Sequence, residues 1–175
     1  MKRTLLLITV IAAAFAGWTP RPAKLRAARQ VEIAAGEIGS RLPEFSLKDL
    51  HGKQLSSSDL TGKVVLVDFW ATWCQPCKKE MPGYQKLLDL YGKQGFAVIG
   101  FKFDTMADSE DPVLFARKIG VRYPLAVASD DLRRRFGGIE GLPTTMLYDR
   151  KGILRKTIVG FEYTSVVESE LKPLL

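Results

Sequence analysis

Cysteine and histidine are both scarce in this chain, whose 175 residues contain two cysteines and one histidine. Two cysteines cannot build a disulfide-dense scaffold, and one histidine leaves too few ligands for a histidine-rich metal site. The sequence also lacks low-complexity tracts, internal repeats and any series of long apolar runs. Disordered, collagen-like and multi-span membrane proteins are therefore excluded, and a single globular domain is predicted.

The formal net charge of +7 is unevenly distributed along the chain. Residues 1–36 carry six basic side chains and one acidic side chain, whereas residues 37–175 carry 20 basic and 18 acidic side chains. The part expected to fold is thus close to neutral. A nucleic-acid-binding domain needs a basic face of its own, so that class of protein is disfavoured.

Residues 1–16 have the pattern of a secretory signal peptide. Lys2 and Arg3 precede an apolar run over residues 4–16 that ends in Ala14-Phe15-Ala16, which predicts export and cleavage after Ala16. The alternative is an uncleaved membrane anchor, although about 20 apolar residues are normally needed to span a bilayer. Either way, we expect the protein in the periplasm or tethered to the outer face of the inner membrane.

Residues 17–40 are predicted to form a basic linker, and residues 41–175 the folded domain. The linker contains two prolines and four basic side chains, and it can include a short helix over Ala23–Ala35. A solvated spacer is the favoured interpretation. Contact between its positive charge and anionic lipid headgroups is the alternative.

The domain alternates between strand and helix patterns before ending in a hairpin and a helix. Strands are predicted over residues 45–47, 54–55, 64–70, 96–103, 125–128, 144–148 and 153–159. Helices are predicted over residues 77–91, 112–119, 131–136 and 163–174, the third starting near an aspartate cap. This order predicts an α/β fold with a mixed central sheet, helices on both faces, an N-terminal β-hairpin and an extra helix–strand insertion.

Both cysteines lie in the segment Trp73-Cys74-Gln75-Pro76-Cys77, between a buried strand and a helix. Cys74 is therefore expected near the helix N-terminus, where unpaired N–H groups and the helix dipole favour a thiolate. The thiolate is the nucleophile in disulfide exchange, and Cys77 lies one turn further on, within reach of a mixed disulfide. We therefore predict redox chemistry in which Cys74 attacks and Cys77 resolves.

Two other interpretations of the cysteine pair are weaker. A purely structural disulfide would close so short a loop that it would constrain the unfolded chain little. A metal site would need two further ligands, and His51 is expected on a distant hairpin tip.

The segment from Val67 to Lys78 closely resembles the active-site segment of thioredoxins. Residues 40–175 as a whole resemble the exported TlpA/ResA-type thiol–disulfide oxidoreductases, with further similarity in Gly52-Lys53, in residues 60–66 and in residues 141–145. The resemblance implies a thioredoxin fold, no cofactor, and a dithiol that exchanges disulfides with a partner protein. It also implies a membrane-embedded thiol reductase as the electron donor.

The resemblance further identifies expected substrate-binding residues. In these proteins the proline of the Gly-x-Pro-Thr stretch is cis and faces the two cysteines, so we expect a cis Leu142–Pro143 bond. Such a bond holds a tight turn and leaves the Leu142 backbone free to pair with an extended substrate segment. Trp73, Leu142 and Pro143 are therefore the expected binding residues. The alternative is a trans proline at the start of a strand.

Two carboxylates complete the candidate site. Asp68 lies inside an apolar strand, where thioredoxins place a buried acid, and burial would raise its pKa and suit it to exchange a proton with Cys77. Glu80 follows Cys77 by three residues on the same helical face, and ResA-type proteins place an active-site glutamate there. The alternative for Glu80 is a solvated side chain beside Lys78 and Lys79. Many relatives carry Asn at the position of Asp68, so which acid shuttles the proton stays open.

The favoured function is a thiol–disulfide oxidoreductase that reduces disulfides of exported proteins such as apocytochrome c. Gln75 and Pro76 place no positive charge between the cysteines, which favours a reductant over an oxidant. One alternative is a thiol-based metal- or haem-handling binding module. Another is a peroxiredoxin-like peroxidase, whose pattern needs Pro seven residues and Thr or Ser three residues before its cysteine. Here Val67 and Ala71 occupy those positions.

Overall fold

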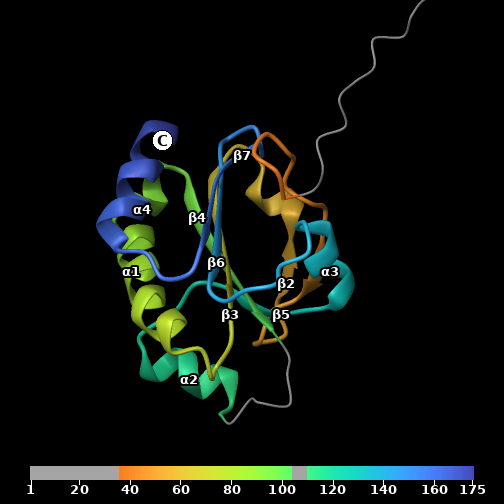
Figure 1. Cartoon of the computed structure of the whole chain (residues 1–175), viewed down its shortest axis with the longest axis vertical. Helices are drawn as coiled ribbons and strands as arrows, with labels where there is room; N and C mark the ends of the chain where they lie inside the picture. The colour runs from red at the N-terminus through yellow and green to blue at the C-terminus, as the bar shows by residue number, and fades with distance from the viewer. Residues whose placement is uncertain (1–35, 104–109) are drawn as a thin grey trace, which may run out of the picture. The chain divides into compact units, whose positions relative to one another are not determined.

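The fully buried strand β3 (Val64–Trp70) occupies the middle of the fold, in a computed structural model that describes residues 36–103 and 110–175 (Figure 1). β3 pairs in parallel with β4 (Phe96–Phe103), which pairs in parallel with β5 (Leu125–Ala128). The leader over residues 1–16, and the helix predicted over Ala23–Ala35, lie outside the described residues.

The other half of the sheet is antiparallel. β6 (Thr144–Tyr148) pairs with the opposite side of β3, and β7 (Leu154–Val159) pairs with β6, which gives the strand order β5-β4-β3-β6-β7. A separate antiparallel hairpin consists of β1 (Ser46–Lys48) and β2 (Gln54–Ser56). The predicted mixed sheet and N-terminal hairpin are therefore confirmed.

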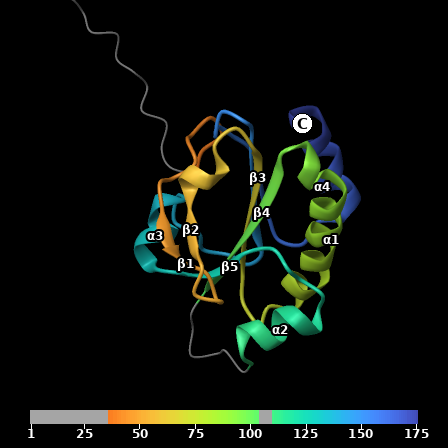
Figure 2. The same ribbon diagram turned by 180° about the vertical axis from the view of Figure 1, so that it is seen from behind.

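Helices cover both faces of the sheet. α1 (Gln75–Tyr91) and α4 (Thr164–Leu171) lie side by side on one face, and α3 (Asp130–Arg135) lies with the hairpin on the other (Figures 1 and 2). α2 (Pro112–Lys118) is fixed near the end of β3 by Phe115, which stacks on Trp70 with ring centroids 5.1 Å apart. Within residues 36–103 and 110–175, no helix is both long enough and apolar enough to cross a bilayer.

An aromatic cluster fills the space between the sheet and the α3 side. Phe69 of β3 makes an edge-on contact with Phe136 at 5.2 Å, and Phe101 of β4 makes one with Phe45 at 5.3 Å. These contacts attach the hairpin and the end of α3 to the central strands, because buried aromatic pairs add specific geometry to apolar burial.

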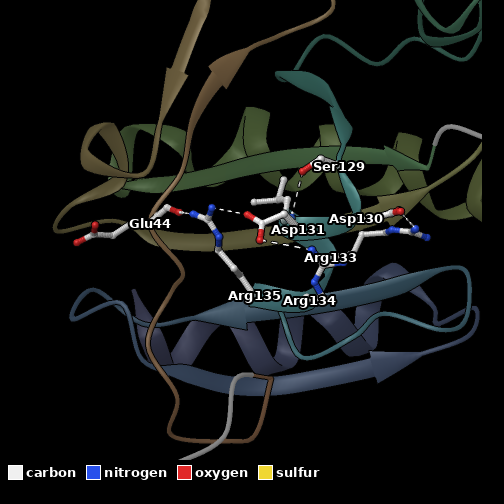
Figure 3. Close-up of polar contacts among 8 residues, drawn as sticks. Glu44, Ser129, Asp130, Asp131, Arg133, Arg134 and Arg135 are labelled. Carbon is white, nitrogen blue, oxygen red and sulfur yellow. Dashed lines mark hydrogen bonds and ion pairs between the residues drawn. The ribbon is translucent and has the colours of Figure 1, made fainter.

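The start of α3 differs from the sequence prediction. Ser129, not an aspartate, is the N-cap, and its hydroxyl accepts a hydrogen bond from the Leu132 N–H at 3.1 Å. Asp130 and Asp131 lie inside the first turn, where they form ion pairs with the arginines that follow (Figure 3). Serine and aspartate side chains cap helices equally well. The sequence alone therefore does not show which of the residues 129–131 is the N-cap.

The contacts of the domain begin slightly before Arg41. The Gly39 N–H donates to the Leu154 carbonyl at 2.9 Å, and the Leu154 N–H donates to the Ser40 carbonyl at 2.8 Å. Ser40 is buried. The chain therefore joins the β6–β7 hairpin as it enters the domain.

We predict that Gly100→Ala lowers the free energy of unfolding by about 1–3 kcal/mol, because the added methyl overpacks the core. A Cβ at Gly100 would lie 2.4 Å from Cδ2 of Leu125 and 2.9 Å from Nε1 of Trp70. Gly92→Ala is the matched control, since its Cβ would meet only Cδ1 of Leu88, at 3.5 Å, and the backbone there is helical. That change should be neutral or slightly stabilising. Equal urea midpoints for the two variants would contradict the packing argument.

Candidate redox site

The two cysteines lie at the N-terminus of α1 and form a disulfide with Cα atoms 5.4 Å apart. Cys74 is the N-cap residue and Cys77 lies in the first turn, so the helix begins two residues earlier than predicted. Pro76 fits this turn because the first N–H groups of a helix have no intrahelical partner.

The helix directs hydrogen-bond donors at Cys74. The Cys77 N–H donates to Cys74 Sγ at 3.2 Å, and the positive end of the helix dipole lies at the same place. Both effects favour a thiolate at Cys74 once the disulfide is reduced. Cys74 is 3% exposed, Cys77 is fully buried, and Trp73 beside them is 43% exposed. Of the two cysteine residues, Cys74 is therefore the more exposed.

Pro143 lies at the same edge of the sheet as the cysteines. Thr144, the next residue, pairs with Phe69 near the end of β3, and the chain reaches Cys74 shortly after that strand ends. The Leu142–Pro143 bond is cis, as predicted. Pro143 is buried, and its carbonyl accepts a hydrogen bond from the Gly160 N–H at 2.8 Å.

Leu142 leaves its backbone free for another chain. It is half-buried, and it forms no hydrogen bond with any residue in the described part of the chain. This is the geometry required for pairing with an extended segment of a partner.

Asp68 and Glu80 are both buried, at 0% and 1% exposure. The interpretation of Glu80 as a solvated side chain is therefore wrong: the helical face it shares with Cys77 points into the protein. Burial raises the pKa of Asp68 well above its usual range. Burial also raises the pKa of Glu80, and the charge of Asp68 raises it further, while the Glu162 backbone and the Tyr84 side chain lower it only in part.

Two hydroxyl groups that sequence analysis missed lie against these acids. The Tyr84 hydroxyl and Oγ1 of Thr145 are 2.9 Å apart and buried. Tyr84 is four residues after Glu80 and therefore on the same face of α1, a spacing visible in the sequence. Thr145 pairs with Asp68 across β3 and β6, which only the strand register reveals. The hydroxyl pair thus connects α1, which carries Glu80, with β6, the strand that pairs with β3 beside Asp68.

The raised pKa values of the two acids lie closer to that of a thiol than ordinary carboxyl pKa values do. A carboxyl group with a raised pKa comes close to the pKa of a thiol, so that a proton can pass between them at small cost in free energy. The helix N-terminus favours a thiolate at Cys74, whereas burial disfavours the charged form of both acids. Such opposing influences on titratable groups are typical of active sites.

A thioredoxin-like fold with a redox disulfide at the start of its first long helix, beside a cis-proline, defines a thiol–disulfide oxidoreductase. The comparisons agree. The chain belongs to the AhpC/TSA family, which matches residues 38–157, and within it to the ResA-type thiol–disulfide oxidoreductases. It is 34% identical over 160 residues to thiol-disulfide oxidoreductase ResA of Geobacillus thermodenitrificans, covering 91% of this chain and 87% of that protein.

Other relatives and solved structures support the same assignment. Thioredoxin-like protein YneN of Bacillus subtilis is 35% identical over 134 residues, covering 76% of this chain and 78% of that protein. A thiol:disulfide interchange protein of Chlorobium tepidum superposes with a TM-score of 0.70 at 30% identity, covering 80% and 99% of the two chains. StoA of Bacillus subtilis, at 24% identity and a TM-score of 0.61 over 73% and 96%, shares the fold.

We predict that the oxidised protein loses stability as pH rises from about 5 to 8. In the unfolded chain carboxyl groups ionise near pH 4, whereas the raised pKa values of Asp68 and Glu80 keep them protonated in the folded protein. Folding therefore binds protons, and each proton lowers the unfolding free energy by up to about 1.4 kcal/mol per pH unit.

Asp68→Asn should flatten this dependence, as measured by urea unfolding at several pH values. The matched control Glu140→Gln removes an exposed acid that forms no ion pair within the described residues, and it should leave the slope unchanged. A slope that Asp68→Asn does not alter would show that Asp68 is ionised in the folded protein.

Proposed function

We propose that the protein reduces disulfides of exported partner proteins, with Cys74 as the nucleophile and Cys77 as the resolving thiol. The observation that supports this proposal is the position of Cys74. It caps α1, its sulfur accepts a hydrogen bond from the Cys77 N–H, and it is the less buried of the two cysteine residues. The secretory pattern of residues 1–16 supports export to the periplasm or to the outer face of the inner membrane.

The proposed reaction consists of two disulfide exchanges. The Cys74 thiolate attacks one sulfur of the partner disulfide, forming a mixed disulfide and releasing the other partner sulfur as a thiolate. Cys77 then passes its proton to the protonated acid pair, which releases one of its own protons to solvent in exchange, and attacks Cys74 Sγ, which releases the second partner thiolate. The products are a reduced partner and the Cys74–Cys77 disulfide that the structure contains.

The surroundings of the cysteines support a role as a reductant. A strongly oxidising disulfide requires a well-stabilised thiolate in the reduced form. Here Gln75 and Pro76 supply no cation, and burial of both cysteines disfavours charge. The cycle then needs an electron donor, for which we propose a membrane-embedded thiol reductase.

The partner would bind in extended form along the Leu142 backbone, between Trp73 and Pro143. Leu142 offers free backbone groups, and Trp73 offers an exposed aromatic surface. Unfolded or extended exported polypeptides, such as apocytochrome c, fit this mode of binding.

We predict that Cys77→Ala accumulates mixed disulfides with partner proteins, because Cys74 can still attack but nothing resolves the product. Cys74→Ser should accumulate none. The measurement is non-reducing electrophoresis of the exported fraction after acid quenching, with the wild-type protein as the reference. If Cys74→Ser is the variant that traps partners, the two roles are reversed.

We also predict a reduction potential nearer to that of thioredoxin, about −270 mV, than to that of DsbA, about −120 mV. Equilibration with glutathione redox buffers, followed by alkylation of free thiols, measures this value. A potential close to that of DsbA would show that the protein acts as an oxidant and would overturn the proposed direction of electron flow.

A further inference from the structure

A groove of about 820 Å³, lined by several charged side chains, lies at the end of the sheet opposite the dithiol. Its walls come from residues 41–46, from the connection between β2 and β3, from the end of α3 and from the β6–β7 turn. Lys63 lines the groove just before β3, and Cys74 follows the other end of that strand. At about 3.3 Å per residue, the groove and the dithiol are roughly 20 Å apart.

The groove is strongly basic although the domain is nearly neutral. Five cationic side chains and one acidic side chain, Glu44, line it. The cationic residues are Arg41, Lys63, Arg135, Arg150 and Lys151. Serine and threonine hydroxyls between them, from residues 56–58 and 61, add further hydrogen-bond donors.

Two of these cations are held in place by the protein. Arg135 donates to the Glu44 carbonyl at 3.0 Å and pairs with Asp131, which fixes its guanidinium at the wall (Figure 3). Arg150 donates to the Gly62 and Gln94 carbonyls at 3.2 and 2.8 Å. Their positions are therefore set before any ligand arrives, which lowers the entropic cost of binding.

The other three cations have no acidic partner. Arg41, Lys63 and Lys151 are exposed, and none of them forms an ion pair with any residue in the described ranges. Three uncompensated charges beside two fixed guanidinium groups create a positive potential that attracts a multiply charged or densely packed anion.

The position of the groove identifies that anion. Gly36, where the described chain begins, lies against the backbone of Phe136 and Gly137, next to the groove residue Arg135. The sequence before it is a basic segment and a short apolar run, which favour a negatively charged membrane surface. A membrane bound at this end would leave the dithiol, at the other end, facing away and accessible.

We propose that the groove binds the phosphate groups of anionic lipids and orients the domain with its dithiol away from the membrane. Each charge near an anionic surface contributes about 1 kcal/mol, or about fivefold in the contact equilibrium. Removing the three unpaired cations should therefore reduce that equilibrium by roughly a hundredfold. The proposal is independent of the direction of the redox reaction.

Amide hydrogen exchange of the full chain, bound to vesicles, tests the proposal. Vesicles of phosphatidylglycerol and phosphatidylcholine should slow exchange in residues 56–63 and around Lys151, whereas pure phosphatidylcholine should not. Arg41→Gln with Lys63→Gln and Lys151→Gln should abolish this protection. Slower hydrogen exchange in these residues shows contact at the groove itself. Binding of the N-terminal segment alone would hold the protein on the vesicle without slowing exchange at the groove.

The matched control changes three exposed cations that do not line the groove: Lys48→Gln, Lys86→Gln and Arg117→Gln. In this variant, anionic vesicles should still slow amide exchange at the groove. Both triple variants should reduce a disulfide substrate at the wild-type rate, which shows that they fold and separates this test from that of the proposed function. Equal protection on the two kinds of vesicle would overturn the proposal. So would equal protection by inorganic phosphate without vesicles, which would indicate a site for a soluble anion.

Discussion

Complete burial of β3 is the constraint on which the rest of the structure depends. A strand covered on both faces must be apolar, yet this one carries Asp68 at its centre and leads directly into the cysteine pair. Burial raises the pKa of Asp68 and so favours its neutral form, which costs less to bury than a carboxylate. The same strand therefore carries a buried acid with a raised pKa and leads into the segment that forms the disulfide.

Two opposite electrostatic influences meet at the dithiol. The N-terminus of α1 favours negative charge on Cys74, and the low-polarity interior around Asp68 and Glu80 disfavours it. In the proposed mechanism, the balance between them sets the redox properties of the pair. Since the helix contribution is common to this fold, the interior acids are the part by which an individual chain can be tuned.

Local features of the site could be predicted from the sequence. The apolar run of β3, the spacing of Cys74 and Cys77, and the position of Glu80 one turn later all depend on residues close in the chain. The cis bond before Pro143 was predicted through family resemblance. Contacts between distant segments could not be predicted in this way, because they require the strand register: the pairing of Thr145 with Asp68 is one example.

The basic groove could not be predicted from the sequence either, because it is formed by segments that are distant in the chain. Arg41, Lys63, Arg135 and Lys151 are far apart in the sequence, where positive and negative residues alternate and nearly cancel. Only the folded chain gathers them at one end. The sequence also does not show which arginine in the run from Arg133 to Arg135 donates to the Glu44 carbonyl.

The near-complete burial of Cys74 has a consequence for the other proteins of its compartment. A sulfur in a residue that is 3% exposed can be approached only by a narrow, extended segment. A disulfide packed inside a folded domain cannot present itself in that way. In the proposed reaction, this geometry would spare the structural disulfides of mature proteins and favour reduction of chains that have not yet folded.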